Sequence, residues 1–433
     1  MRYRLLAAIV ALLLLCSGCS LDVETFLRPP LAQEEQQKIQ GALETYIRDS
    51  GNAGIGYTLQ YPSEGEYTSA YVLCDDSGRP VADTAEQAAL AVAFYKLTAT
   101  KEAHVNLLRR SGEEWVSVGD VVGVGTDILK VSFGDLDGDG TAELLTGWST
   151  YNSRDHRLAV LSVKNGLSVL SEDRLYTRLL VCDVAALNFD PLLLLRIGDG
   201  NEVTATLAVW QNGVLKDVDK EPLDGYIQQF GAMELCTLDD NVYGVYVDAS
   251  KSGGTTVTEL IYFDGTSLHV PFYDEDKGVT TVTARRTGLS CQDIDGDGQM
   301  EIPISRLLPG QETATKEYPT TAYLTVWRRW NYLTGDWTDV MHTVVNSVDN
   351  YVIALDDSQR RGLTTRYEAT THTLTLCDGD GKAWLRLRPA DPTAPSTGYV
   401  PLAEATQTRA GFEVWYDEER LDMQKVRYMI SFG

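Results

Sequence analysis

Two stretches of the chain share one acidic pattern. They read Asp135-Leu136-Asp137-Gly138-Asp139-Gly140-Thr141-Ala142-Glu143 and Asp293-Ile294-Asp295-Gly296-Asp297-Gly298-Gln299-Met300-Glu301. Ca²⁺ binds about six to eight oxygens at about 2.3 to 2.6 Å, and alternating carboxylates on a tight turn supply them. A glycine in such a turn permits the positive φ that the turn requires. The pattern therefore predicts two Ca²⁺ sites.

Each loop offers five candidate ligands to one ion. In the first loop they are Asp135, Asp137, Asp139, the backbone carbonyl of Thr141, and Glu143, and in the second Asp293, Asp295, Asp297, Gln299 and Glu301. An EF-hand would need a glutamate at its twelfth loop position, where this chain has Thr146 in one copy and Ile304 in the other. Apolar runs over residues 128–133 and 144–145 flank the first loop in place of helices. We therefore expect the loops to join strands; the alternative is an acidic hairpin without an ion.

The residues around the first loop, from Phe133-Gly134 to Leu144, resemble the FG-GAP/VCBS repeat, with Glu143 in place of the more usual Asp. Such repeats occur in integrin α-subunit propellers and in many bacterial surface proteins. The resemblance implies a β-propeller that holds Ca²⁺ in loops between blade strands and serves binding or rigidity instead of catalysis. The two good copies directly cover only a small part of the chain.

The chain from residue 56 to 343 consists of short alternating or β-branched runs separated by Gly, Asp and Asn, which is typical of antiparallel strands. An apolar strand, an Asp-rich turn and another apolar strand recur, with turns near Asp75, Asp135, Asp183, Asp239 and Asp293. The spacings of 48 to 60 residues suit four-stranded propeller blades with long loops. We predict a β-propeller-like repeat domain over 56–343, with two stacked β-sandwiches as the alternative.

The two ends of this β region have a different character. Ile39, Leu43, Tyr46 and Ile47 recur at helical spacing and predict an amphipathic helix over residues 34–49. Residues 344–433 are predicted to form a small α+β domain with strands at 351–355, 373–376 and 383–387 and a helix within 420–429. The fold class expected is therefore mainly β, with a short N-terminal helix and a small C-terminal α+β domain.

The N-terminus carries the features of an exported protein. Arg2 and Arg4 precede an apolar run of twelve residues, which is too short for a transmembrane helix of about 20 residues, so residues 1–18 are predicted to be a signal peptide. Leu15-Cys16-Ser17-Gly18-Cys19 resembles a bacterial lipobox, which implies a diacylated Cys19 at the start of a tether and helix over 19–55. Two acyl chains give stable anchoring. We expect an extracytoplasmic protein, lipid-anchored to the bacterial cell membrane; an ordinary secretory signal is the alternative.

Charge and cysteine content restrict the partners further. The chain has 37 basic and 62 acidic residues, and loss of the signal peptide removes two arginines, so nucleic acid and anionic lipid are unsuitable partners. The remaining cysteines, Cys74, Cys182, Cys236, Cys291 and Cys377, are scattered singly. Their spacing shows no disulfide framework or metal site, and we expect them in the core.

The sequence contains no recognisable catalytic constellation. The five histidines lie in no metal or nucleophile pattern, and Gly123-Val124-Gly125 lacks the third glycine and the helix of a dinucleotide site, so it is predicted to be a turn between strands. We predict a non-enzymatic binding or scaffold protein for an unknown protein or glycan ligand. The alternative is a carbohydrate-active hydrolase or glycan-binding protein, because carboxylate pairs are available. Six aromatic residues are candidates for sugar stacking, although core packing is favoured for them: Trp148, Tyr151, Trp327, Trp330, Tyr332 and Trp337.

Overall fold

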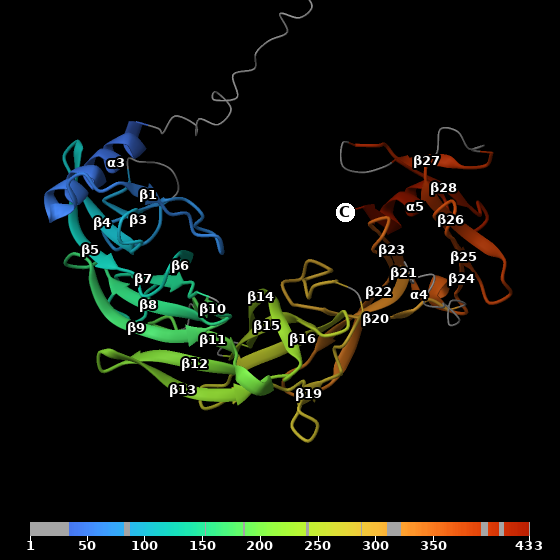
Figure 1. Cartoon of the computed structure of the whole chain (residues 1–433). Coiled ribbons are helices and arrows are strands. Elements are labelled where there is room, and N and C mark those ends of the chain that lie inside the picture. Colours follow the sequence, from blue (N-terminus) through green and yellow to red (C-terminus); the bar gives the residue numbers. More distant parts are fainter. Residues whose placement is uncertain are drawn as a thin grey trace, which may run out of the picture. The chain divides into compact units, whose positions relative to one another are not determined.

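A computed structural model describes residues 34–81, 87–151, 153–184, 187–239, 242–286, 288–309, 322–390, 397–406 and 411–432 (Figure 1). The predicted signal peptide, the lipid-bearing Cys19 and the tether lie outside these residues. None of the helices in the described ranges is long and apolar enough to cross a bilayer. The chain divides into two compact units, the first holding most residues up to 173 and the second most of those that follow.

The described chain is mainly β and begins with a short helix, as predicted. Helix α3 (Glu34–Ile47) has two acidic residues in its first turn, where they favour the helix dipole, and it buries Ile39, Leu43 and Ile47. A short π-helix η1 (Arg48–Asn52) continues it and ends as Gly51 takes a positive φ. Glu35 holds the helix to the sheet beneath, because its carboxylate accepts a hydrogen bond of 2.7 Å from Trp115 Nε1.

The first unit contains two antiparallel sheets. Their strands are β1 (Tyr57–Leu59), β2 (Tyr71–Cys74), β3 (Leu90–Leu97), β4 (Ala103–Ser111) and β5 (Glu114–Val122) in one sheet, and β6 (Ile128–Gly134), β7 (Glu143–Trp148), β8 (His156–Ser162) and β9 (Ser168–Tyr176) in the other. Strand β3 is apolar on both faces because Ala93 packs toward α3 and Phe94 toward the second sheet. The second sheet is a meander whose neighbouring strands follow each other along the chain.

The second unit begins with two more meanders. They are formed by β10 (Arg178–Val181), β11 (Leu192–Ile197), β12 (Val203–Gln211) and β13 (Val214–Pro222), with the 3-10 turn η2 (Asp199–Asn201), and by β14 (Ile227–Asp239), β15 (Val242–Lys251), β16 (Thr255–Phe263) and β17 (Leu268–His269). A shared core of leucine, valine and isoleucine side chains, including Leu195, Val247 and Ile261, packs them together. The hairpin β18 (Tyr273–Asp274) and β19 (Val279–Thr280) follows.

Two five-stranded sheets complete the second unit. One is formed by β20 (Ile302–Leu307), β21 (Ala322–Trp330), β22 (Trp337–Asn346), β23 (Tyr351–Leu355) and β29 (Ile430–Phe432), and the other by β24 (Thr364–Glu368), β25 (Thr373–Cys377), β26 (Ala383–Pro389), β28 (Phe412–Tyr416) and β27 (Val400–Ala403). Two short helices, α4 (Asp357–Arg360) and α5 (Met423–Met429), lie among them in the sequence. A common core joins the two sheets and α5.

The C-terminal strands lie where the sequence predicts them, and α5 falls within the helix predicted at 420–429. The predicted domain boundary at residue 344 lies inside β22, which pairs with both β21 and β23. Strand β29, at the C-terminal end, also joins this sheet through β23. The sheet therefore extends across residue 344 without interruption.

The recurrent unit seen in the sequence corresponds to successive sheets. The turns at Asp75, Asp135 and Asp183 separate β2 from β3, β6 from β7, and β10 from β11. Asp239 ends β14 before β15 begins, and Asp293 precedes β20 in a loop closed by a bridge between residues 292 and 301. Each Asp-rich turn therefore comes near the start of a new antiparallel sheet.

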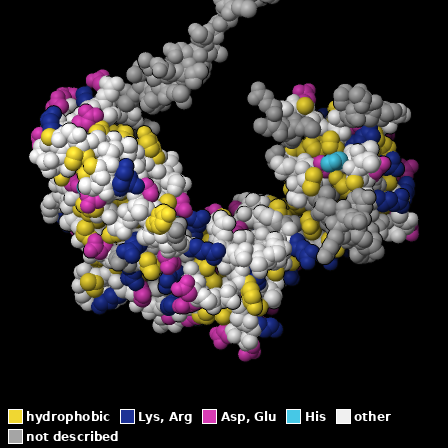
Figure 2. Space-filling model, viewed as in Figure 1, with side chains coloured by type: hydrophobic (Ala, Val, Ile, Leu, Met, Phe, Trp, Pro, Cys, Tyr) yellow, Lys and Arg dark blue, Asp and Glu magenta, His cyan; other side chains and the backbone are white. Residues whose placement is uncertain are grey.

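Charged side chains of both signs are interspersed on the face that Figure 2 shows. The cysteines are not part of the polar surface: Cys74, Cys182, Cys291 and Cys377 are buried and Cys236 is partly buried. Burial raises the pKa of the Cys74 thiol to about 12. Such thiols stay protonated at neutral pH and act as small apolar core residues.

The Gly123-Val124-Gly125 segment joins β5 to β6, as predicted. A Cβ on Gly123 would lie 2.4 Å from the Trp148 ring, and one on Gly125 would lie 2.3 Å from the Ser149 carbonyl oxygen. Trp148 is only 1% exposed and is fixed by a hydrogen bond from its Nε1 to Thr146. Glycine is needed here because the ring leaves no space for a side chain.

We expect Gly123→Ala to lower the free energy of unfolding by about 1 to 3 kcal/mol, the usual effect of overpacking a tight core. Urea unfolding followed by tryptophan fluorescence measures it. The matched control is Gly41→Ala in α3, where no atom lies within 4 Å of the added Cβ. Because alanine favours a helix, this change should stabilise the protein by up to about 1 kcal/mol. Equal effects of the two substitutions would contradict the packing of Gly123 against Trp148.

Candidate functional site

The two acidic loops adopt the same conformation. In the first, Asp135 accepts hydrogen bonds from the backbone N–H groups of Asp139 and Gly140 at 3.1 and 2.8 Å. In the second, Asp293 accepts from the equivalent groups of residues 297 and 298 at the same two distances. The two glycines of each loop have positive φ, 75° and 87° in one and 79° and 86° in the other. The two copies of the motif are thus structural equivalents.

The first loop brings carboxylates from both of its ends together. Asp135, Asp137 and Glu143 each place an oxygen within 4.8 Å of the others, and Glu143 is only 3% exposed. Leu136, between the two aspartates, is buried and anchors the loop. Asp139 is not in this group; its carboxylate pairs with Lys164 and accepts a hydrogen bond from Thr141 N–H. The Lys164 hydrogen bond is the main reason why the pKa of Asp139 is lowered.

The second loop gathers a different subset of its carboxylates. Asp293, Asp295 and Asp297 each place an oxygen within 4.8 Å of the others, and all three are exposed. The hydrogen bond from Gly298 N–H is the main cause of the lowered pKa of Asp293. Glu301 is not in this group. It is fully buried and accepts a 3.0 Å hydrogen bond from Ile294 N–H.

Arg329 is the charged partner of the second loop. Its guanidinium lies 2.5 Å from Glu301 Oε1, 2.9 Å from Asp297 Oδ2 and 3.6 Å from Asp295 Oδ2. Although burial opposes the charge, the hydrogen bond to Glu301 and its electrostatic attraction raise the pKa of Arg329. A permanently charged side chain thus approaches the carboxylates from the adjacent strand β21.

The donor sets fit a calcium ion. Oxygens on opposite sides of one Ca²⁺ lie about 5 Å apart, since each bond is about 2.3 to 2.6 Å long, and the 4.8 Å groups satisfy this limit. Hard carboxylate oxygens are the ligand type that Ca²⁺ prefers, and remaining positions are commonly filled by carbonyls and water. The Ca²⁺ assignment of both loops stays a prediction.

The predicted ligands thus divide into two kinds. The structure gathers Asp135, Asp137 and Glu143 in one loop and Asp293, Asp295 and Asp297 in the other. It places Asp139 and Glu301 in ion pairs, and the backbone N–H groups of Thr141 and Gln299 in hydrogen bonds to aspartates. Sequence reasoning did not find Arg329. The available signal was a charged residue between aromatic ones, in Trp327-Arg328-Arg329-Trp330.

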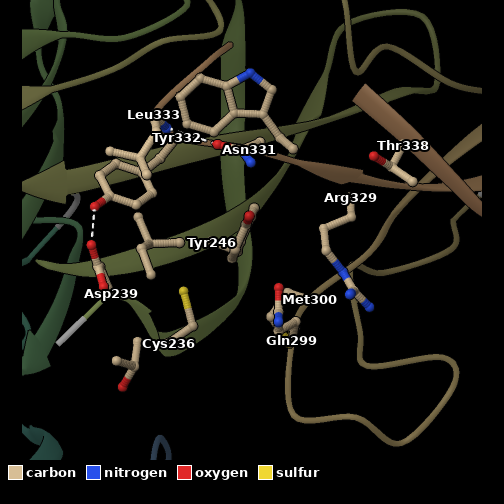
Figure 3. A pocket seen from close by; sticks show the side chains of 13 residues that line it. Cys236, Asp239, Tyr246, Gln299, Met300, Arg329, Asn331, Tyr332, Leu333 and Thr338 are labelled. Atoms are coloured by element: carbon tan, nitrogen blue, oxygen red, sulfur yellow. Dashed lines mark hydrogen bonds between the residues drawn. The ribbon is translucent and has the colours of Figure 1, made fainter. Parts of the chain in front are cut away.

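A pocket of about 240 Å³ adjoins the second loop. Its wall is formed by Gln299 and Met300 of the loop, residues 236–239 of β14, Tyr246 of β15, residues 329–333 from β21 and the turn after it, and Thr338 of β22. Figure 3 shows Tyr332 hydrogen-bonded to Asp239 on one side of the pocket and Arg329 beside Gln299 on the other. The Tyr332 hydroxyl donates to Asp239 Oδ2 at 2.6 Å.

The six aromatic residues that are candidates for sugar stacking, and for which the sequence favours core packing, occupy different environments. Trp148 and Trp327 are buried at 1% and 2% exposure, and Trp337 stacks on Phe272 with ring centroids 5.3 Å apart, so these three serve the core. Tyr151 is 86% exposed. Trp330 and Tyr332 line the pocket, and the Tyr262 ring lies 6.3 and 6.0 Å from them. Of the six candidate aromatics, only Trp330 and Tyr332 therefore lie where they can contact a ligand in this pocket.

No family model matches the chain, and no curated protein matches it either. Among solved structures, it is similar to an exotype rhamnogalacturonan lyase, YesX, with a TM-score of 0.31 and 12% identity over 82% of this chain and 86% of the other. The Bacillus licheniformis rhamnogalacturonan lyase PL11 gives 0.32 and 15%, over 75% and 65%. An exo-β-1,3-galactanase of Phanerochaete chrysosporium gives 0.25 and 10%, over 79% and 81%. Likenesses of this extent indicate neither a family nor an activity for this chain.

Proposed function

We propose that the chain is a surface lipoprotein, held at the membrane through Cys19, whose calcium-stabilised β-repeat region binds a glycan without catalysis. One observation carries the proposal: the second acidic loop and its partner Arg329 also form part of the pocket wall. A cation in this loop would fix Gln299 and Met300 in place. Calcium would thereby favour ligand binding by holding these two lining residues in one conformation.

Ca²⁺ would supply fixed positive charge at the second loop. Asp293, Asp295 and Asp297 would hold the ion, and Arg329 would keep its hydrogen bonds to Glu301 from the other side. Because Glu301 is fully buried, its charge needs this partner in either state. Arg329 would therefore position the loop relative to the rest of β21, and it also lines the pocket.

The lining of the pocket suits a sugar. Trp330 and Tyr332 contribute aromatic rings to the lining, Trp330 also packing on Phe272, and Asp239, Gln299 and Thr338 contribute polar atoms that can orient hydroxyl groups. Asp239 is the one carboxylate among the described lining residues. Glycoside hydrolysis in its usual form needs two carboxyl groups about 5 to 9.5 Å apart. This favours binding over hydrolysis.

The repeat architecture belongs to the same proposal. Successive four-stranded antiparallel meanders, each with an Asp-rich turn near its start, are what propeller blades would provide, and the resemblance to FG-GAP/VCBS repeats points the same way. We propose that these sheets are blades of a propeller-like region. In such a region the acidic loops would stiffen the connections between strands.

A glycan array probed with the full chain in Ca²⁺ and in chelator tests the function. We expect binding that is lost in chelator and weakened about fivefold by Trp330→Ala, because an aromatic stacking contact contributes about 1 kcal/mol. Tyr151→Ala, which removes an exposed ring outside the pocket, is the matched control and should bind normally. Binding that ignores both Ca²⁺ and Trp330 would contradict the proposal.

Hydrolysis and scaffolding are the competing functions, and each gives its own signal. A hydrolase would release product from chromogenic glycosides and lose this activity in Asp239→Asn. A scaffold would retain protein partners from solubilised native membranes without binding any glycan. We expect neither result.

A further inference from the structure

Three ionisable side chains meet in the interior of the second unit. Asp224 precedes β14, Lys251 ends β15, and Glu259 lies within β16, so neighbouring strands and the loop beside them bring the groups together. The side chain of Asp224 is 0% exposed, that of Lys251 is 14% exposed, and Glu259 is fully buried. Leu223 and Ile227, on either side of Asp224, belong to the apolar core.

Thr280 of β19 fixes the three groups at one point. Its backbone N–H donates to Asp224 Oδ2 at 2.8 Å, its hydroxyl donates to Glu259 Oε1 at 2.6 Å, and its carbonyl accepts from Lys251 Nζ at 3.4 Å. Lys251 Nζ also donates directly to Asp224 Oδ2. The ammonium and the carboxylate are therefore in contact, with Glu259 one hydrogen bond away from the same residue.

The carboxyl group of Glu259 is partly satisfied, by the Thr280 hydroxyl and by a backbone hydrogen bond from Asp224. Among the described residues, its Oε2 finds no hydrogen-bond partner, although the atom is buried. Burial raises the pKa of Glu259 to about 7. A carboxyl group buried beside an amine and a second carboxyl group, all held by Thr280, is placed for proton transfer.

We propose that Lys251 and Asp224 condense into an intramolecular amide bond, with Glu259 as the proton-transfer group. Such a bond would join the loop before β14 to the end of β15. Two buried charges would disappear in the product, which removes the cost of keeping them out of water. The proposal is independent of the metal sites and of the glycan pocket.

The reaction balances with no other reagent. A proton passes from Lys251 Nζ to the Asp224 carboxylate along their hydrogen bond, and the neutral amine then attacks Asp224 Cγ to form the C–N bond. The Tyr226 N–H, 2.8 Å from Asp224 Oδ1, stabilises the negative charge that develops on that oxygen. Glu259 takes the second amine proton and delivers it to the other oxygen, and the C–O bond breaks to release one water molecule. The contact between Lys251 Nζ and the Asp224 carboxylate lowers the barrier because the reacting groups are already held together, and burial of Asp224 limits the access of water.

One other lysine-carboxylate pair of the described residues lacks these features. Lys277 contacts Asp274 directly, yet their side chains are 68% and 32% exposed. Both of these side chains lie against solvent, whereas the Asp224 side chain is fully buried. Lys277 is therefore an internal control for the reaction at Lys251.

Tryptic peptide mapping of the purified full chain tests the bond. Trypsin cleaves after Lys220, Lys251 and Lys277, and no other lysine or arginine lies between residues 221 and 277. Because an acylated lysine is not cleaved, we expect one peptide of residues 221–277 that is lighter than its sequence by the mass of one water molecule. Cleavage after Lys277 should be normal.

The conservative variants Glu259→Gln and Lys251→Arg should each give separate peptides, 221–251 and 252–277, at full sequence mass. Circular dichroism of both variants checks that they fold. The proposal is overturned if the folded wild-type protein itself yields these two peptides at full mass. It is also overturned if the lighter peptide persists unchanged in Glu259→Gln, since the proton-transfer role would then be wrong.

Discussion

Replacing Arg285 by methionine is expected to lower the free energy of unfolding by about 3 to 5 kcal/mol, because one partner of a buried ion pair is removed. The Arg285 side chain is 0% exposed, and its Nη2 lies 2.8 Å from Asp248 Oδ1. It also donates to the Thr258 hydroxyl at 2.9 Å and to the Leu289 carbonyl at 2.6 Å. Arg285 thus ties the segment before the second acidic loop to β15 and β16.

In Arg285→Met the buried Asp248 carboxylate would retain the hydrogen bonds from Thr258 and from Cys291 N–H but lose its counter-charge. Urea unfolding followed by circular dichroism measures the change. The surface control is Lys277→Met, which removes an exposed pair and should cost less than about 1 kcal/mol. Adding Asp248→Leu to Arg285→Met should restore part of the stability. If Arg285→Met and Lys277→Met lower the free energy of unfolding equally, the ion pair between Arg285 and Asp248 does not stabilise the segment before the second acidic loop.

Calcium is expected to stabilise the chain by a comparable amount. A ligand at about 100 times its dissociation constant adds about 2.7 kcal/mol per site to the free energy of unfolding, so two sites should add about 5 kcal/mol. The double variant Asp137→Ala with Asp295→Ala removes one carboxylate from each group and should lose this gain. Thermal unfolding in Ca²⁺ and in chelator measures it.

The two single variants separate the loops. A cation entering the second loop must compete with Arg329 at Asp295 and Asp297, whereas Lys164 in the first loop is half-exposed and pairs with Asp139, outside the group gathered there. We therefore expect Asp137→Ala to remove the tighter site and Asp295→Ala the weaker one. Asp76→Ala, in a turn without the full carboxylate set, is the control and should leave the calcium response intact. A calcium response that survives the double variant would place the sites elsewhere.

Local sequence patterns predicted the strands and the acidic loops because their causes are local. Continuous apolar or β-branched runs form strands such as β6 and β23, which the sequence indicates at 128–133 and 351–355. The Asp-x-Asp-Gly-Asp-Gly order determines the loop conformation, because Asp135 binds the N–H groups of its own turn and two glycines supply positive φ. These features need no knowledge of distant residues.

The site beyond the loops depends on contacts between residues far apart in the chain. Arg329 meets Glu301 across 28 positions, and Tyr332 meets Asp239 across 93, so the pocket follows only from the pairing of β20, β21 and β22 and their packing on β14. The Lys251 network likewise joins Thr280 to Asp224, 56 residues apart. One local signal was available: Glu259 stands at a core-facing position between Val257 and Ile261.

The role of the aromatic residues also needed the structure. Trp327 and Trp330 belong to the same strand, β21, yet the first is buried in the core and the second lines the pocket. Alternation along the strand predicts that they face opposite sides, because three positions separate them. Which side is covered depends on the neighbouring sheets, and no pattern within β21 contains that information.

The most direct test of a calcium-stabilised binding protein is a calorimetric titration of Ca²⁺ into the full chain and into the Asp137→Ala, Asp295→Ala double variant. We predict two sites in the wild-type protein, with dissociation constants of about 10⁻⁴ to 10⁻³ M, as in extracellular modules, and no binding heat in the variant. A wild-type protein that takes up no Ca²⁺, or a variant that binds it equally well, would contradict the account.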